Sequence, residues 1–153
     1  METVPTTEPI ADTGEQTVAG VRQRRSGLHA VLVELEAAIA APGRSQAWSD
    51  RVAAGLERLR VALAEHIVGT EGPDGLFDQV IRRTPRLAHH CAQLTSEHVA
   101  IGDATTAAQE AVHNDPGDVR EAVLSLLALL ARHRQHGADL IYEAYDVDLG
   151  GSD

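Results

Sequence analysis

The chain has 153 residues and a formal net charge of −10, and 43% of its residues are hydrophobic although only 3% are aromatic. This length predicts one domain, and the negative charge disfavours binding to nucleic acid or to an anionic membrane surface. The apolar runs are too short for a membrane span, and the N-terminal residues lack the pattern of a signal peptide, so a cytoplasmic location is expected. A single cysteine, Cys91, excludes an internal disulfide and a thiolate metal cage.

The first half of the chain predicts two long helices. Residues 1–16, rich in Thr, Pro and Glu, show no periodic apolar pattern and are expected to form a flexible tail. From residue 17 to about residue 41 the apolar side chains recur every three to four positions, which predicts a helix that ends before Pro42. Ser45 is a suitable N-cap for a second helix, which Gly69 and the turn after it bring to an end.

The second half predicts one short and two long helices. The short helix covers residues 75–83 and follows a Gly-Pro-Asp-Gly turn. Thr84 and Pro85 are suited to start the third long helix, which carries the most regular apolar pattern of the chain. Asp115 precedes the fourth long helix, which ends near Tyr145.

Short connections between long helices make sequence neighbours antiparallel. The predicted fold is therefore all-α: an up-down-up-down antiparallel four-helix bundle over residues 17–146, with a short extra helix between the second and third long helices. Residues 147–153 are expected to form a flexible C-terminal tail.

Three histidines stand at core-facing positions of this predicted bundle. His66, His98 and His133 lie on three different helices, each in register with apolar residues where another apolar side chain would be expected. A buried imidazole without partners costs about 1–3 kcal/mol, so the rings must be satisfied by one another, by carboxylates, by water or by a metal ion. Together they favour a metal site, since neutral imidazole suits iron, zinc and copper.

Further candidate ligands lie near these histidines in the sequence. His29 lies on the flank of the first helix, where it could point inward or toward solvent. Glu71 comes at the last turn of the second helix, where the helix dipole disfavours a carboxylate unless a cation compensates it. Three further candidate ligands follow His133 on the fourth helix: His136, Asp139 and Glu143.

The first and second long helices meet near residue 43, and the third and fourth meet near residue 114. Counting residues outward from these two short connections predicts the position of each side chain along the bundle axis. The count places His98 and His133 at the same position along the bundle axis. It places His66 about 12 Å from His29 along that axis. The count allows two groups, one with His29, His98 and His133, the other with His66, Glu71, Asp139 and His90. Two metal ions about 3.5–4 Å apart would require slippage or bulges, and a single-metal site or no site stays open.

Four segments resemble the hemerythrin-like (HHE cation-binding) family: the first helix with His29, then LAEHIVGTEGPDGLF, LTSEHVAI and ARHRQHGADLIYEAY. The resemblance covers about residues 20–145. It implies a four-helix bundle with a carboxylate-bridged, non-haem di-iron centre that binds oxygen, senses oxygen or redox state, or handles nitric oxide and peroxide. The metal ligands that it implies are His29, His66, Glu71, His98, His133 and Asp139.

The expected function is therefore that of a non-haem iron protein in oxygen, nitric oxide or redox sensing or handling, whose partner is a diatomic ligand or peroxide. The sequence leaves open whether it is an enzyme and whether it forms oligomers. One alternative is a metal-free bundle that serves as an interaction or dimerisation module. Another is a core pocket for a small apolar molecule, with histidines as acid and base.

Overall fold

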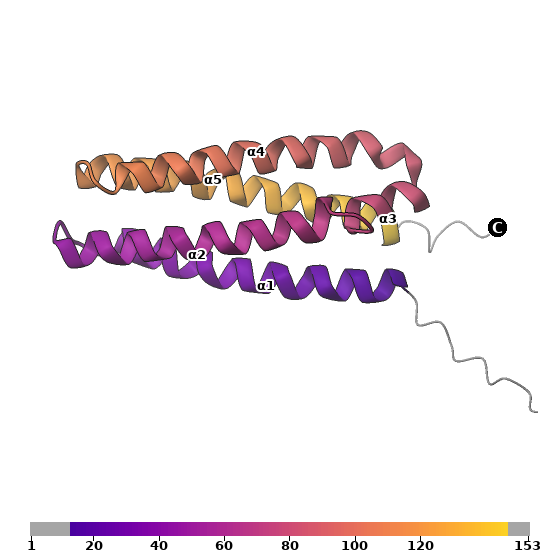
Figure 1. Cartoon of the computed structure of the whole chain (residues 1–153), viewed down its shortest axis with the longest axis horizontal. Coiled ribbons are helices and arrows are strands. Elements are labelled where there is room, and N and C mark those ends of the chain that lie inside the picture. The colour runs from indigo at the N-terminus through magenta and orange to yellow at the C-terminus, as the bar shows by residue number, and fades with distance from the viewer. Residues whose placement is uncertain (1–12, 147–153) are drawn as a thin grey trace, which may run out of the picture.

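The computed structural model describes residues 13–146, and every regular element in that range is helical. Four long helices lie side by side along the long axis of the molecule: α1 (Thr13–Ala40), α2 (Gln46–Glu71), α4 (Ala88–Ala111) and α5 (Pro116–Ile141) (Figure 1). The predicted all-helical class with four long helices is confirmed. Among the described helices, none combines the length and apolar character that a membrane span requires.

Short helical elements complete the described chain. The helix α3 (Leu76–Arg83) follows α2, and a 3-10 turn (Pro85–Leu87) precedes α4. A π-helical turn (Tyr142–Asp146) follows α5. The connections α1–α2 and α4–α5 lie at one end of the bundle, and α3 lies at the other end with the last turns of α5 (Figure 1).

Two helix starts differ from the expectation. The helix α1 begins at Thr13 rather than at residue 17, because the intervening residues contain no proline and continue the helix backward. Residues 1–12 of the predicted N-terminal tail, and all of the predicted C-terminal tail, lie outside the described residues. The helix α4 begins at Ala88, since the turn that starts at Pro85 is wound as a tighter 3-10 helix.

Side-chain caps fix the starts of α2 and α5. The Ser45 hydroxyl accepts a hydrogen bond from the backbone N–H of Trp48 at 3.2 Å, as the sequence predicts for an N-cap. At α5, the Asp115 carboxylate accepts from the backbone N–H of Gly117 at 2.7 Å, and Pro116 occupies the first turn. These caps set the register in which both helices present their apolar faces.

Trp48 and Arg120 fasten α5 to the α1–α2 connection. The buried Trp48 ring donates its Nε1–H to the carbonyl oxygen of Ala38 at 2.9 Å. The Arg120 guanidinium lies 4.5 Å from the centroid of the Trp48 ring. It also donates to three carbonyl oxygens at the end of α1 and after it, those of Ile39, Ala41 and Gly43. One side chain of α5 thus satisfies three backbone acceptors at this helix end and just after it.

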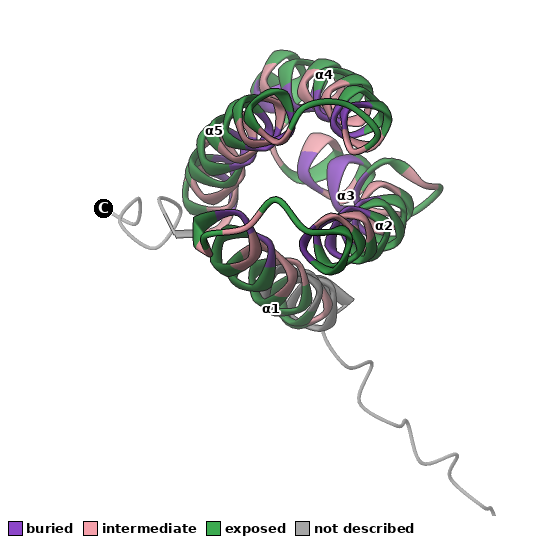
Figure 2. Ribbon diagram, turned by 90° about the vertical axis from the view of Figure 1, so that its left-hand side faces the viewer, coloured by how far each residue is buried: buried purple, intermediate pink, exposed green. Residues whose placement is uncertain are grey.

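The buried side chains form two apolar clusters. The buried stretches of the helices face the inside of the ring that the helices form (Figure 2). The larger one joins α1, α2, α4 and α5 toward the tight connections, and includes Leu63, Ile101 and Leu130. The smaller one lies beneath α3 and includes Leu94 and Leu140. Between Leu94 and Ile101 on α4, and between Leu130 and Leu140 on α5, the buried face changes from apolar to polar, and a histidine stands there on each helix.

Candidate metal centre

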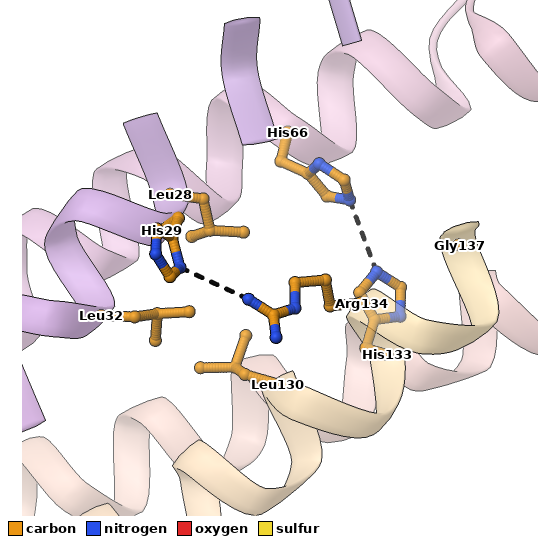
Figure 3. A pocket seen from close by; sticks show the side chains of 8 residues that line it. All are labelled: Leu28, His29, Leu32, His66, Leu130, His133, Arg134 and Gly137. Carbon is orange, nitrogen blue, oxygen red and sulfur yellow. Dashed lines mark hydrogen bonds between the residues drawn. The ribbon is translucent and has the colours of Figure 1, made fainter. Parts of the chain in front are cut away.

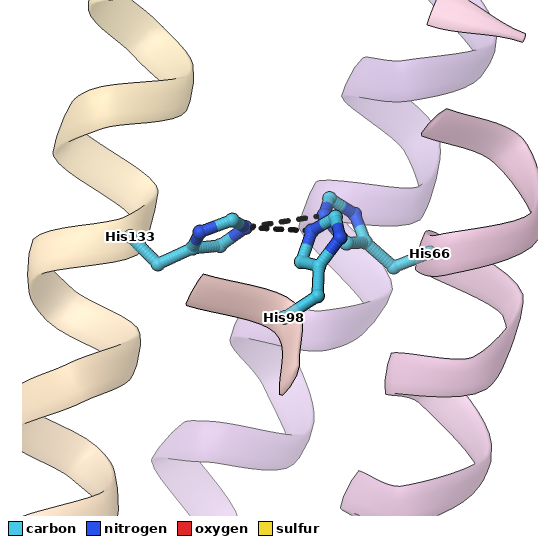
Figure 4. A group of neighbouring side chains, drawn as sticks. All are labelled: His66, His98 and His133. Carbon is cyan, nitrogen blue, oxygen red and sulfur yellow. Dashed lines mark hydrogen bonds between the residues drawn. The ribbon is translucent and has the colours of Figure 1, made fainter. Parts of the chain in front are cut away.

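His66, His98 and His133 meet in the layer between the two apolar clusters. They come from α2, α4 and α5, and one ring nitrogen of each lies within 4.8 Å of the others (Figure 4). Only 9%, 3% and 6% of their respective surfaces are exposed. Nε2 of His133 lies 3.0 Å from Nε2 of His98 and 3.4 Å from Nε2 of His66.

The spacing of apolar residues explains why these rings face inward. His66 follows the buried Leu63 by three positions, His98 follows Leu94 by four, and His133 follows Leu130 by three. On an α-helix such steps return a side chain to the same face, so each histidine continues the buried stripe of its own helix. The same apolar pattern that builds the bundle therefore gathers the three imidazoles.

Two glutamate carboxylates contact the Nδ1 atoms of His98 and His133. Glu71, the last residue of α2, contacts Nδ1 of His98, and Oε2 of Glu97 lies 2.7 Å from Nδ1 of His133. An ionised carboxylate can only accept hydrogen bonds, so both Nδ1 atoms carry the proton and donate it. In the neutral rings the Nε2 atoms of His98 and His133 therefore hold lone pairs.

Those two lone pairs face each other across 3.0 Å. Neutral rings with this tautomer cannot form an N–H···N bond there, so the contact requires either a shared proton or a cation. In metalloproteins, a carboxylate that bonds one ring nitrogen of a histidine commonly orients the ring, while the other nitrogen binds the metal. The carboxylates thus prepare both rings as ligands.

The pKa shifts favour the neutral form of His133. Burial lowers the pKa of its imidazole below the ordinary value, and this outweighs the opposing hydrogen bond to Glu97. Burial alone would raise the pKa of the Glu97 carboxyl, but hydrogen bonds from His133 and His136 outweigh burial and hold that pKa below its ordinary value. At neutral pH the pair is therefore a carboxylate beside a neutral imidazole.

The nitrogen separations from His133 to the other two rings are compatible with one shared metal ion. Imidazole nitrogens at about 2.1 Å from the same ion lie about 3.0 Å apart for octahedral angles and about 3.4 Å apart for tetrahedral angles. The Nε2 separations from His133 to His98 and to His66, 3.0 and 3.4 Å, fall at these values, and one nitrogen of each of the three rings lies within 4.8 Å of the others. Three neutral imidazoles are a donor set suited to iron, zinc or copper, so the residues present fit a single transition-metal ion.

Glu97 is the part of this arrangement that the sequence analysis missed. Its second oxygen, Oε1, lies 2.5 Å from Nδ1 of His136, a side chain that is 42% exposed. Glu97 thus links the buried His133 to a ring at the surface. One signal was present in the sequence: the count that sets His98 level with His133 also sets the adjacent Glu97 beside the same turn of α5.

The structure does not bring His29 and Asp139 into the cluster. His29 is exposed, and its Nδ1 lies 3.4 Å from an Arg134 guanidinium nitrogen. Asp139 is also exposed and accepts a hydrogen bond from Gln135 at 2.9 Å. Glu143, the other carboxylate considered on this helix, lies near Arg86 and His90, at 3.5 and 3.9 Å. Of the six ligands that the resemblance implies, the structure gathers His66, His98 and His133, with Glu71 bonded to one of them.

The predicted grouping by height was partly wrong. His98 and His133 are adjacent, as the count predicts, but His66 rather than His29 completes their group. The count compared only helices joined by a tight connection. It contained no information on how the pair α1–α2 is shifted along the axis relative to the pair α4–α5, because α3 and its turns join the two pairs.

Two small cavities touch the cluster. One of about 50 Å³ lies between α1 and α5 and has His66 and His133 on its wall (Figure 3). The other, of about 20 Å³, lies under α3 beside the same two rings, with Phe77 and Leu140 on its wall. A water molecule needs about 10–15 Å³, so both cavities have room for a small molecule next to the cluster.

Comparison of the chain with models of known protein families, with curated proteins and with solved structures gave no match. The geometry of the histidine cluster and its carboxylates therefore carries the functional argument.

Proposed function

We propose that this protein is a hemerythrin-like, up-down-up-down antiparallel four-helix bundle that binds non-haem iron and acts in oxygen, nitric oxide or redox sensing or handling. The observation that carries the proposal is the convergence of Nε2 atoms from His66, His98 and His133, two of them 3.0 Å apart with their Nδ1 atoms bonded to carboxylates. The choice of iron rests on the resemblance of the sequence, since the donor set also suits zinc and copper.

Each group has a defined part in this proposal. The three imidazoles hold the ion, and Glu71 and Glu97 keep His98 and His133 in the tautomer that presents Nε2. Bound iron would supply an open coordination position and a change of oxidation state. Apolar Leu28, Leu32 and Leu130 line the adjacent cavity, which suits a diatomic ligand better than a large polar one.

The proposal is for one ion in each chain. A second ion next to the first would need further ligands, and the candidates for that role, His29 and Asp139, make other contacts at the surface. Glu71 and Glu97 are engaged with histidine Nδ1 atoms and do not bridge two metal positions.

The test is the metal content of protein purified from an iron-supplied culture and then incubated anaerobically with ferrous iron. We expect about one iron per chain in the wild type, and a loss of most of it in His98→Leu and in His133→Leu. His89→Leu is the matched control, since His89 is exposed on the same helix as His98. Equal iron content in all four proteins would contradict the assignment, and stoichiometric zinc with no iron would contradict the choice of iron.

The metal-free interaction module remains a second candidate because of one observation. A single proton shared between Nε2 of His98 and Nε2 of His133 would also satisfy their 3.0 Å contact. That arrangement predicts a protein whose melting temperature is unaffected by chelators and by added iron. The iron-binding proposal predicts instead that added iron raises the melting temperature.

A further inference from the structure

The cavity between α1 and α5 has an unusual lining for a protein with a net charge of −10. Its walls are apolar, formed by Leu28, Leu32 and Leu130. The charged or titratable side chains on its lining are imidazoles and one guanidinium, that of Arg134, and its lining includes no carboxylate. The cavity therefore combines apolar walls with groups that favour an anion.

Arg134 and His29 face each other on the lining of this cavity. They come from α5 and α1, and their facing nitrogens lie 3.4 Å apart (Figure 3). A second cavity, of about 260 Å³, has the same pair on its wall and shares Leu32 and Leu130 with the first cavity. Glu36 lines this second cavity but not the first. The pair therefore lies on the walls of both cavities, of which only the smaller one reaches His66 and His133.

We propose that this cavity is a binding site for a short-chain monocarboxylate of about four carbons. The carboxylate would lie at the Arg134 guanidinium, which can bind it with two parallel hydrogen bonds. The hydrocarbon chain would lie among Leu28, Leu32 and Leu130 and point toward His133. On the scale of about 10–15 Å³ for one water, a cavity of about 50 Å³ accommodates a chain of a few carbon atoms.

This site does not depend on a metal ion, although its occupant would share the cavity with the small ligand of the proposed function. The probe is sodium butyrate, titrated into metal-free full-length protein and followed by calorimetry and by the NMR signals of the Leu methyl groups. Matched sodium chloride controls for ionic strength, and 1-butanol supplies the same chain without the charge.

We expect butyrate to bind at least tenfold more tightly than 1-butanol and to shift methyl signals of Leu28, Leu32 and Leu130. Arg134→Gln should weaken butyrate binding at least tenfold and leave 1-butanol binding unchanged. Arg132→Gln, an exposed arginine of the same helix, should bind butyrate like the wild type.

Equal affinities for butyrate and 1-butanol would overturn the proposal, as would unchanged butyrate binding in Arg134→Gln. Shifts spread over the surface without the three leucines would mean adventitious ion binding and would overturn it too. Because the titration uses metal-free protein, its outcome is independent of iron content, so a failure of this proposal and a failure of the iron-binding proposal are separate results.

Discussion

Glu97 bonds two imidazoles of α5 with its two oxygens, at 2.7 Å to His133 and 2.5 Å to His136. The two histidines are three residues apart, so they stand one turn apart on the same face of the helix. Charge-assisted bonds of this kind fix both the tautomer and the orientation of a ring. Glu97 is therefore a positioning residue for His133.

Replacement of Glu97 by Gln removes the charge while keeping the size of the side chain. We expect metal affinity to fall about 10–100-fold, with the helical content unchanged, because the amide no longer stabilises Nδ1–H on two rings. Competition with a chelator of known affinity measures the change. Glu110→Gln, an exposed carboxylate on the same helix, is the control and should retain wild-type affinity; an equal affinity in Glu97→Gln would refute the role.

The lowered pKa of His133 predicts how the stability of the metal-free protein depends on pH. Because burial lowers its folded-state pKa below the ordinary value of about 6.5, the unfolded chain binds a proton that the folded chain does not. The contribution of His133 to the free energy of unfolding is therefore fully present above about pH 6.5 and declines as the pH falls from there toward the folded-state pKa.

Urea unfolding of metal-free protein at pH 7.5 and pH 5.5 checks this expectation. The difference between the wild type and His133→Gln isolates the histidine from the other titrating groups. We expect the wild type to lose more stability than the variant when the medium is acidified. Parallel losses in both proteins would show that His133 takes no part in the pH dependence.

At the scale of the elements, Arg120 makes a separable contribution to stability. Its guanidinium donates to carbonyl oxygens of Ile39, Ala41 and Gly43 and covers the Trp48 ring. Arg120→Ala leaves these acceptors without their donor, so we expect a loss of about 1–3 kcal/mol in the free energy of unfolding. Metal content should not change, since the contacts lie at the end of the bundle away from α3 (Figure 1).

Denaturant unfolding of Arg120→Ala against Arg132→Ala measures that contribution. Arg132 is exposed on the same helix, so its removal should change stability by less than about 0.5 kcal/mol. Equal stability of the two variants would show that the contacts of Arg120 are energetically neutral.

The sequence predicts the helices well because each one repeats apolar residues on one face and is bounded by residues such as Ser45, Asp115 and Pro116. It also predicts that His66, His98 and His133 face the core, because they stand in register with buried leucines. The sequence marks Glu71 as a candidate ligand, but it does not predict the contact of Glu71 with Nδ1 of His98 or that of Glu97 with His133. Glu71 and Glu97 lie on the flanks of their helices, and their contacts depend on how far neighbouring helices are shifted and rotated.

At the scale of the whole molecule, the histidines form a polar layer between two apolar clusters. The larger cluster holds α1, α2, α4 and α5 together on one side of the layer, and α3 closes the other side. Such a layer costs stability unless its polar groups are satisfied. Within the described residues, every buried side-chain nitrogen and oxygen has a hydrogen-bond partner. Without a metal ion, the Nε2 atoms of His98 and His133 are satisfied only if they share a proton.

The most direct test of the account is an anaerobic titration of metal-free protein with ferrous iron, with bound metal measured at each step. The account predicts saturation at one iron per chain, with imidazole nitrogen ligands in the X-ray absorption spectrum of the loaded protein. Saturation at two irons per chain, or no uptake at all, would contradict a single three-histidine site at His66, His98 and His133.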